Sequence, residues 1–193
     1  MIFVTGRRIN LLVYWSDVLA QQVVNFREYY TQMNSLLSLA EQLGQVLTAK
    51  GLLLATAESC TGGEVAQVIT SIPGSSAWFE RGFVTYSNTA KMEMLGVPSQ
   101  TLMDNGAVSE QTVCAMAEGA LQHSPAHFSV AITGIAGPGG GTAEKPVGTV
   151  WFSWAAKHRP TLAKKQFFSG DRQSVRDQAT RFALEQLLSF VQS

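Results

Sequence analysis

A short polar run between an apolar stretch and a predicted helix start carries side chains that could act on a substrate. The run extends from Glu58 to Gly63 and reads Glu-Ser-Cys-Thr-Gly-Gly. A helix N-terminus has free N–H groups and the positive end of the helix dipole, so it suits a phosphate, a carboxylate or an oxyanion. Ser59 is therefore a candidate nucleophile and Thr61 a candidate helix cap. The alternative is that both hydroxyls only cap the helix, although the pair Gly62-Gly63 weakens the helix start and favours close approach by a ligand.

Cys60 is the rival nucleophile, because a thiol at a helix N-terminus has a lowered pKa. It would need a histidine partner, and the three histidines of the chain, His123, His127 and His158, all fall in predicted turns. We therefore interpret Cys60 as a small packed residue. Pro125 between the first two histidines spoils the geometry of a metal-binding pair, and the chain has no zinc motif. We expect no metal and no cofactor.

A second group of candidate residues lies in the run from Tyr86 to Lys91, which joins a predicted strand to a helix and includes Asn88. A serine–lysine pair works only if the lysine is largely neutral, which requires burial or a nearby cation. Lys91 in the first helical turn is the candidate base, and Tyr86 could relay a proton or hold the hydroxyl. The alternative is a lysine that extends along an apolar surface into solvent, with a tyrosine in the core.

The third group is a glycine-rich loop that runs from Gly134 to Thr142, directly after Thr133. It lacks the Gly-Lys-Ser/Thr sequence of a P-loop, so either it cradles a substrate or it acts as a mobile lid. Arg172 and Arg176 lie four residues apart on the predicted last helix. They form either ion pairs on a solvated face or a phosphate contact.

The elements that would position these residues alternate between strand and helix from Met33 onward. We expect helices near 34–49, 63–72 and 91–95, a helix that starts at 109 and includes residue 121, and a last helix near 171–191. Strands are expected near 52–56, 78–87, 128–133, 147–155 and 162–168. This alternation predicts an α/β fold, a three-layer α/β/α sandwich with a mixed, mostly parallel sheet. Ligands of such sheets bind in loops beyond the strand ends, here the loops at 57–63 and 134–142.

Residues 1–32 differ from the rest of the chain: they have no clear hydrophobic period, and beyond the first turn they hold five aromatic residues. These aromatic residues are Tyr14, Trp15, Phe26, Tyr29 and Tyr30. We interpret 1–32 as an N-terminal extension, explained either by a mis-assigned start codon or by an arm for docking and oligomerisation. The domain then spans residues 33–193. Because the aromatic segment would otherwise expose apolar surface, we expect a homo-oligomer, most simply a dimer.

Composition limits the function classes. The 193 residues carry no net charge, and 15% are charged against about 25% in a typical domain, while 46% are hydrophobic. These values exclude a disordered chain and the basic footprint of a nucleic-acid binder. Two cysteines exclude a disulfide framework, and no apolar run approaches the ~20 residues of a membrane span. We expect a cytoplasmic protein with a small-molecule substrate, no nucleic-acid partner and no membrane association.

Five motifs occur in an order that resembles a known family. They are Thr56–Gly63, Tyr86–Lys91 with Leu95–Val97, Gly106–Ser109, Thr133–Pro138 and Val147–Val150. Together they resemble the CinA C-terminal domain family, the nicotinamide-nucleotide amidohydrolases, and most closely its stand-alone bacterial enzymes. The resemblance covers about Leu36 to Leu188. It implies an α/β/α sandwich that hydrolyses the carboxamide of nicotinamide mononucleotide to nicotinic acid mononucleotide and ammonia, in pyridine nucleotide recycling.

The resemblance also implies a serine nucleophile with lysine and tyrosine helpers, which by motif position are Ser59, Lys91 and Tyr86. We expect neutral Lys91, directly or through Tyr86, to take the Ser59 proton, and the N–H groups of 61–63 to stabilise the oxyanion. Because the pyridinium is cationic and the phosphate anionic, the site should offer opposite charges at its two ends. The residues expected to contact the substrate are Glu58, Cys60, Thr61, Gly62, Gly63, Asn88, Thr133, Gly134 and Gly137.

One position departs from the family pattern. The sequence Glu80-Arg81-Gly82-Phe83 stands where many relatives have two glycines, so no role follows for Arg81. Two other functions stay open. One is a non-catalytic module that binds a nucleotide, and the other is an amidase for a different amide.

Overall fold

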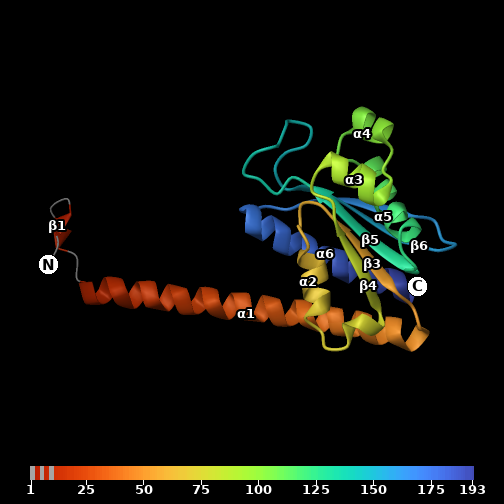
Figure 1. Cartoon of the computed structure of the whole chain (residues 1–193). Coiled ribbons are helices and arrows are strands. Elements are labelled where there is room, and N and C mark those ends of the chain that lie inside the picture. Colours follow the sequence, from red (N-terminus) through yellow and green to blue (C-terminus); the bar gives the residue numbers. More distant parts are fainter. Residues whose placement is uncertain (1–2, 5–6, 9–10) are drawn as a thin grey trace. The chain divides into compact units, whose positions relative to one another are not determined.

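The chain alternates strands and helices as the sequence predicts (Figure 1). A computed structural model describes residues 3–4, 7–8 and 11–193. The elements are β1 (Phe3–Val4), β2 (Arg7–Arg8), α1 (Leu11–Lys50), β3 (Leu54–Glu58), α2 (Glu64–Thr70), the 3₁₀ turn η1 (Ser75–Ala77), β4 (Phe79–Val84), α3 (Asn88–Leu95), α4 (Ser99–Asn105), α5 (Glu110–Gln122), β5 (Phe128–Gly134), β6 (Thr149–Ala156), β7 (Leu162–Phe167) and α6 (Arg172–Gln192).

The central sheet has five strands in the order β4-β3-β5-β6-β7. β3 pairs in parallel with β4 and β5, whereas β6 is antiparallel to both β5 and β7. β4, β3, β5 and β7 therefore run in one direction and β6 alone runs in the other, which confirms the mixed, mostly parallel sheet. As a consequence, the carboxyl ends of these four strands lie at the same edge of the sheet.

Helices cover both faces of this sheet (Figure 1). On one face, α5 packs on β3, β5 and β6 and also contacts α3 and α4. α5 approaches α3 closely: a Cβ at Gly119 would lie 2.0 Å from the carbonyl oxygen of Leu95. Glycine at this position therefore lets α5 hold the C-terminal end of α3, the helix that carries Lys91.

The other face packs on α2 and α6. The indole N–H of Trp154 on β6 donates to the carbonyl of Ala183 on α6, and the Phe182 ring lies 4.8 Å from that of Phe152. α6 begins where the sequence predicts, because the Asp171 carboxylate accepts from the backbone N–H of Ser174 at 2.8 Å. This cap fixes the start of α6 directly after β7.

The N-terminal part differs from its prediction. α1 begins at Leu11, well before the helix start expected near residue 34, and α4 was not predicted at all. The chain divides into two compact units, Met1–Leu36 and Leu37–Ser193. The side chains of Tyr14, Trp15, Tyr29 and Tyr30, on which the oligomerisation arm depends, lie outside what the structure describes. The extension, the oligomer and the cytoplasmic location stay predictions. Among the described residues, no helix is long and apolar enough to cross a membrane.

Candidate active site

Ser59 and Lys91 meet at the edge of the sheet where the parallel strands end. Ser59 follows β3 directly, and Lys91 lies in the first turn of α3, the helix that follows β4. The Lys91 Nζ is 3.0 Å from the Ser59 Oγ and 2.8 Å from the carbonyl oxygen of Thr85. The lysine is 1% exposed and the serine 8%, so the interpretation of Lys91 as a lysine extended into solvent is wrong.

The burial of Lys91 favours its neutral form. Removal from water lowers the pKa of Lys91 below the usual lysine value, because burial penalises the charged form. Its two hydrogen-bond partners are a hydroxyl and a backbone carbonyl, and neither carries the negative charge that would restore the ammonium form. The pair can therefore exist with a neutral amine against the serine hydroxyl, which is the state that a general base requires.

Glu58, expected to contact the substrate, caps α2. Its carboxylate is fully buried and accepts from the backbone N–H groups of Gly63, Val65 and Ala66 at 2.9–3.1 Å. Neither Ser59 nor Thr61 caps this helix, and the Thr61 Oγ1 is buried with no hydrogen-bond partner among the described residues. The hypothesis that the two hydroxyls serve only as caps is therefore wrong.

The same arrangement corrects the expected oxyanion donors. The N–H of Gly63 is bound to Glu58, and the N–H of Gly62 donates to the carbonyl of Ser59 at 3.1 Å. The N–H groups of Cys60 and Thr61 lie against the Cys60 sulfur, yet burial raises the pKa of that thiol to about 12. A thiol of this pKa stays protonated near neutral pH, so Ser59 is the nucleophile candidate. The N–H of Cys60, the residue that follows Ser59 and lines the cavity, is then the candidate oxyanion donor.

A cavity of about 220 Å³ opens over the Ser59–Lys91 pair. Seven of the predicted site residues line it: Ser59, Cys60, Tyr86, Asn88, Lys91, Thr133 and Gly134. The structure does not place Glu58, Thr61, Gly62, Gly63 or Gly137 in the lining. Four further lining residues were not predicted as such, Ala107, Val108, Ala136 and Arg172. Of these, Ala107, Val108 and Ala136 belong to motifs of the family resemblance, which could have pointed to them, and Arg172 was considered only as a possible phosphate contact.

Tyr86 contacts Arg172 rather than the Ser59–Lys91 pair. The Tyr86 hydroxyl accepts from the Arg172 guanidinium at 2.6 Å, and the same guanidinium donates to the carbonyl of Gly137 at 2.8 Å. The tyrosine is 61% exposed, so it is not a core residue. Arg172 therefore ties the glycine-rich loop to the strand end at Tyr86 and places a fixed positive charge at the cavity.

The charges of the cavity favour an anion. Its described lining contains Lys91 and Arg172 but no aspartate or glutamate, so the negatively charged end expected for a pyridinium is not supplied by a side chain. Among the described residues, no cluster of three or more histidine, cysteine or acidic side chains could hold a metal ion. Arg81 lies outside the lining and donates to Glu80 and to the carbonyl of His123.

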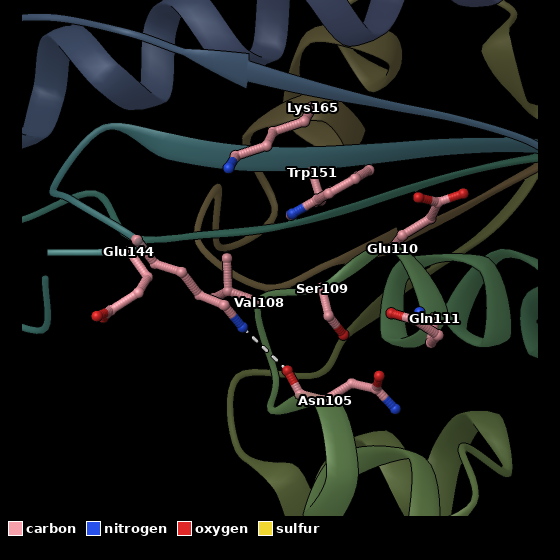
Figure 2. Close-up of a pocket in the computed structure, with 9 residues that line it drawn as sticks. Asn105, Val108, Ser109, Glu110, Gln111, Glu144, Trp151 and Lys165 are labelled. Carbon is pink, nitrogen blue, oxygen red and sulfur yellow. Dashed lines mark hydrogen bonds between the residues drawn. The ribbon is translucent and has the colours of Figure 1, made fainter. Parts of the chain in front are cut away.

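A second hollow of about 300 Å³ shares one lining residue, Val108, with the first cavity (Figure 2). It is bordered by the start of α5 with Ser109 and Glu110, by Glu144, which follows the glycine-rich loop, and by Trp151 and Lys165 on the sheet. Neither Ser59 nor Lys91 lines it. The chemistry described above therefore belongs to the smaller cavity.

Comparison with known proteins identifies the family. The family described as CinA C-terminal domain matches residues 36–191. The chain belongs to the CinA C-terminal domain family. It is 58% identical over 154 residues to the nicotinamide-nucleotide amidohydrolase PncC of Escherichia coli strain K12, covering 80% of this chain and 93% of that protein. The protein of the same name from Pseudomonas putida is 49% identical over 156 residues, covering 81% of this chain and 97% of that protein.

Solved structures of the CinA family share the fold. The crystal structure of the competence/damage inducible protein CihA from Agrobacterium tumefaciens superposes with a TM-score of 0.79 at 48% identity, covering 82% of this chain and 96% of that chain. A CinA superfamily protein from Escherichia coli gives a TM-score of 0.77 at 42% identity, covering 80% and 90%. The α/β class predicted from the sequence is thus the fold of the family.

The capping role of Glu58 predicts a large loss of stability in Glu58→Gln. The NH₂ group of the new amide would face backbone N–H donors of α2 and leave buried donors unpaired. The negative charge that strengthens these hydrogen bonds would also be lost, at a total cost of roughly 2–4 kcal/mol. Urea denaturation measures this loss. The matched change Glu41→Gln alters an exposed carboxylate on α1 and should cost less than about 0.5 kcal/mol. Equal losses in the two variants would contradict the capping role.

Proposed function

We propose that this chain is an amidohydrolase that converts nicotinamide mononucleotide to nicotinic acid mononucleotide and ammonia, a step of pyridine nucleotide recycling. The observation that carries the proposal is the buried Lys91 amine 3.0 Å from the Ser59 hydroxyl, with no carboxylate as its hydrogen-bond partner. The names of the relatives supply the substrate: proteins 58% and 49% identical to this chain are called nicotinamide-nucleotide amidohydrolases.

The reaction starts with proton transfer from the Ser59 hydroxyl to the neutral Lys91 amine. The serine oxygen attacks the carboxamide carbon, and the Cys60 N–H donates to the oxyanion that forms. Lys91 then gives its proton to the amide nitrogen. The C–N bond breaks, ammonia departs, and the acyl group stays on Ser59 as an ester. Water, deprotonated by Lys91, then attacks the ester and releases the acid. The direct route is favoured over relay through Tyr86, because the Lys91 Nζ already lies 3.0 Å from the Ser59 Oγ, whereas the Tyr86 hydroxyl contacts Arg172.

Arg172 is the residue we assign to the phosphate. It lines the cavity, it is exposed, and its guanidinium is held by contacts to Tyr86 and to Gly137. An exposed guanidinium keeps its charge and presents donors that match phosphate oxygens. Asn88 and Tyr86, both exposed at the same cavity, are placed to contact the ribose.

Replacement of the nucleophile tests the reaction. Ser59→Ala should lower the release of ammonia from nicotinamide mononucleotide at least about a thousandfold, because the base then has no proton to accept and no covalent intermediate forms. Cys60→Ala is the matched control and should keep activity within about tenfold. Ammonia is measured without added metal. Binding of the mononucleotide without any ammonia release by the folded wild type would instead indicate a non-catalytic binding module.

The protonation state of Lys91 predicts the pH profile. The neutral amine becomes more abundant as pH rises, so kcat/KM should rise with pH along a single-proton limb. Because burial lowers the pKa of Lys91, the midpoint should lie below the usual lysine value of 10.5. Lys91→Arg preserves a cation that cannot lose its proton and should lose the activity at every pH. Wild-type rates in Lys91→Arg, or a midpoint at 10.5 or above, would exclude Lys91 as the base.

The phosphate assignment predicts a change in selectivity. Arg172→Ala should raise KM for nicotinamide mononucleotide by roughly 10–100-fold, the value of one charge-assisted hydrogen bond, and leave turnover of the phosphate-free riboside unchanged. Lys165→Ala is the control, since Lys165 lines only the second cavity, and it should change neither value. Equal effects of Arg172→Ala on the two substrates would refute the assignment.

A further inference from the structure

A chain of two peptide units connects an arginine of α6 to the N–H beside the nucleophile. The Arg176 Nη2 donates to the carbonyl of Thr61 at 2.8 Å. The N–H of that same peptide unit belongs to Gly62 and donates to the carbonyl of Ser59 at 3.1 Å. The N–H of this second unit belongs to Cys60, which lines the cavity. A guanidinium cation therefore stands at one end of the chain and the Cys60 N–H at the other.

Hydrogen bonds in such a chain polarise one another. A donor on a peptide oxygen draws electron density from the N–H of the same unit and makes that N–H a stronger donor. A hydrogen bond from a charged donor is roughly twice as strong as one between neutral groups. The Arg176 charge therefore strengthens the Gly62 bond and, through it, the Cys60 N–H. It also fixes the turn that sets the distance from this N–H to the Ser59 oxygen.

Arg176 is held in this position by its surroundings. Its Nη2 forms an ion pair with the Glu64 carboxylate at 3.1 Å, and its Nη1 donates to the Gln173 side chain at 3.2 Å. The Nε is buried with no hydrogen-bond partner among the described residues. α2, which begins with Glu64, packs against α6 (Figure 1). The arginine thus lies in a fixed contact behind the nucleophile turn, one helical turn from Arg172.

We propose that Arg176 is a positioning residue that polarises and orients the Cys60 N–H as oxyanion donor, and that ionised Glu64 damps this effect. The inference rests on the proposed function, because the oxyanion forms in that reaction. Arg176 touches neither the cavity nor the reacting atoms, so it acts only through the two peptide units.

Glu64 makes the effect depend on pH. Its side chain is 12% exposed, and burial, with a further contribution from the facing Asp177 carboxyl, raises the pKa of Glu64 to about 7. The groups of α6 that act on it are Arg176, Asp177 and Thr180. On the other elements packed against α2, the Glu58 carboxylate faces the N–H groups of α2, and Glu80 on β4 is paired with Arg81. Below pH 7 Glu64 is mostly neutral and does not compensate the positive charge of Arg176. Above pH 7 the ionised carboxylate partly compensates that charge.

Steady-state kinetics with nicotinamide mononucleotide test the positioning role. Arg176→Met should lower kcat by roughly 10–100-fold with KM within threefold, and Arg176→Lys should restore part of the loss. The control Arg159→Met removes a comparable contact, from a guanidinium to the Phe190 carbonyl on α6, and should leave kcat unchanged. An effect of Arg176→Met on KM alone, or none on kcat, would overturn the proposal.

Glu64→Gln distinguishes polarisation from simple support of the fold. Both enzymes keep Lys91, so the pH dependence that Lys91 causes cancels in the ratio of the kcat of Glu64→Gln to that of the wild type. It should be near one at pH 6, where Glu64 is mostly neutral, and rise to about two to five at pH 8.5. A residue that only braced the turn would give a ratio at or below one at every pH, and that result would overturn the proposal.

A substrate-independent measurement separates this inference from the proposed function. The Cys60 amide proton of ¹⁵N-labelled protein should shift with a midpoint near pH 7 in the wild type, lose that titration in Glu64→Gln and move upfield in Arg176→Met. If the wild type releases no ammonia while the Cys60 amide shift titrates with Glu64, the proposed function fails and the coupling of Arg176 and Glu64 to the Cys60 N–H stands. If ammonia is released but neither Glu64→Gln nor Arg176→Met changes the Cys60 amide shift, the proposed coupling of Arg176 to the Cys60 N–H is overturned. Failure of both measurements overturns both proposals.

Discussion

The burial of one lysine is the constraint on which the site depends. An amine removed from water without a counter-charge favours its neutral form, and this is unfavourable for folding unless the surrounding structure holds the side chain there. Lys91 is held by the start of α3, where the Ser87 hydroxyl accepts from the Ala90 N–H. The far end of the same helix is fixed by its close contact with Gly119. The packing of the C-terminal end of α3 against α5 therefore helps to hold Lys91, the proton acceptor, near the N-terminal end of α3.

The direction of the strands explains why distant residues share one cavity. β3, β4, β5 and β7 all end at the same edge of the sheet, so the segments that follow them meet there. Ser59, Tyr86, Gly134 and Arg172 each stand at or just beyond one of these four ends. The single reversed strand, β6, returns the chain after the glycine-rich loop and lets β7 deliver α6 to the same edge. Reversal of one strand thus adds Arg172 to a site built from parallel strands.

Local patterns were sufficient to predict the layers of the fold, the helix starts near Ser109 and Asp171, and the strand-to-helix segments that carry Ser59 and Lys91. They were insufficient wherever a contact joins elements far apart in sequence. The bond between Tyr86 and Arg172 spans 86 residues, so neither side chain carries a local sign of it. The capping role of Glu58 was missed for a related reason. Its pairing with the N–H groups of α2 depends on the left-handed backbone at Gly62 and Gly63, which residue types alone do not specify.

Depth separates the two basic side chains of the cavity into different roles. A volume of about 220 Å³ is smaller than the 300–1,000 Å³ of pockets that enclose a whole drug-sized ligand, so in the proposed reaction only the carboxamide and its ring enter. Chemistry then takes place beside buried Lys91, where charge is disfavoured and a base is available. The phosphate stays at the exposed Arg172, where water keeps the guanidinium charged at little cost. Burial at one end and exposure at the other thus let one small cavity supply both a base and a binding charge.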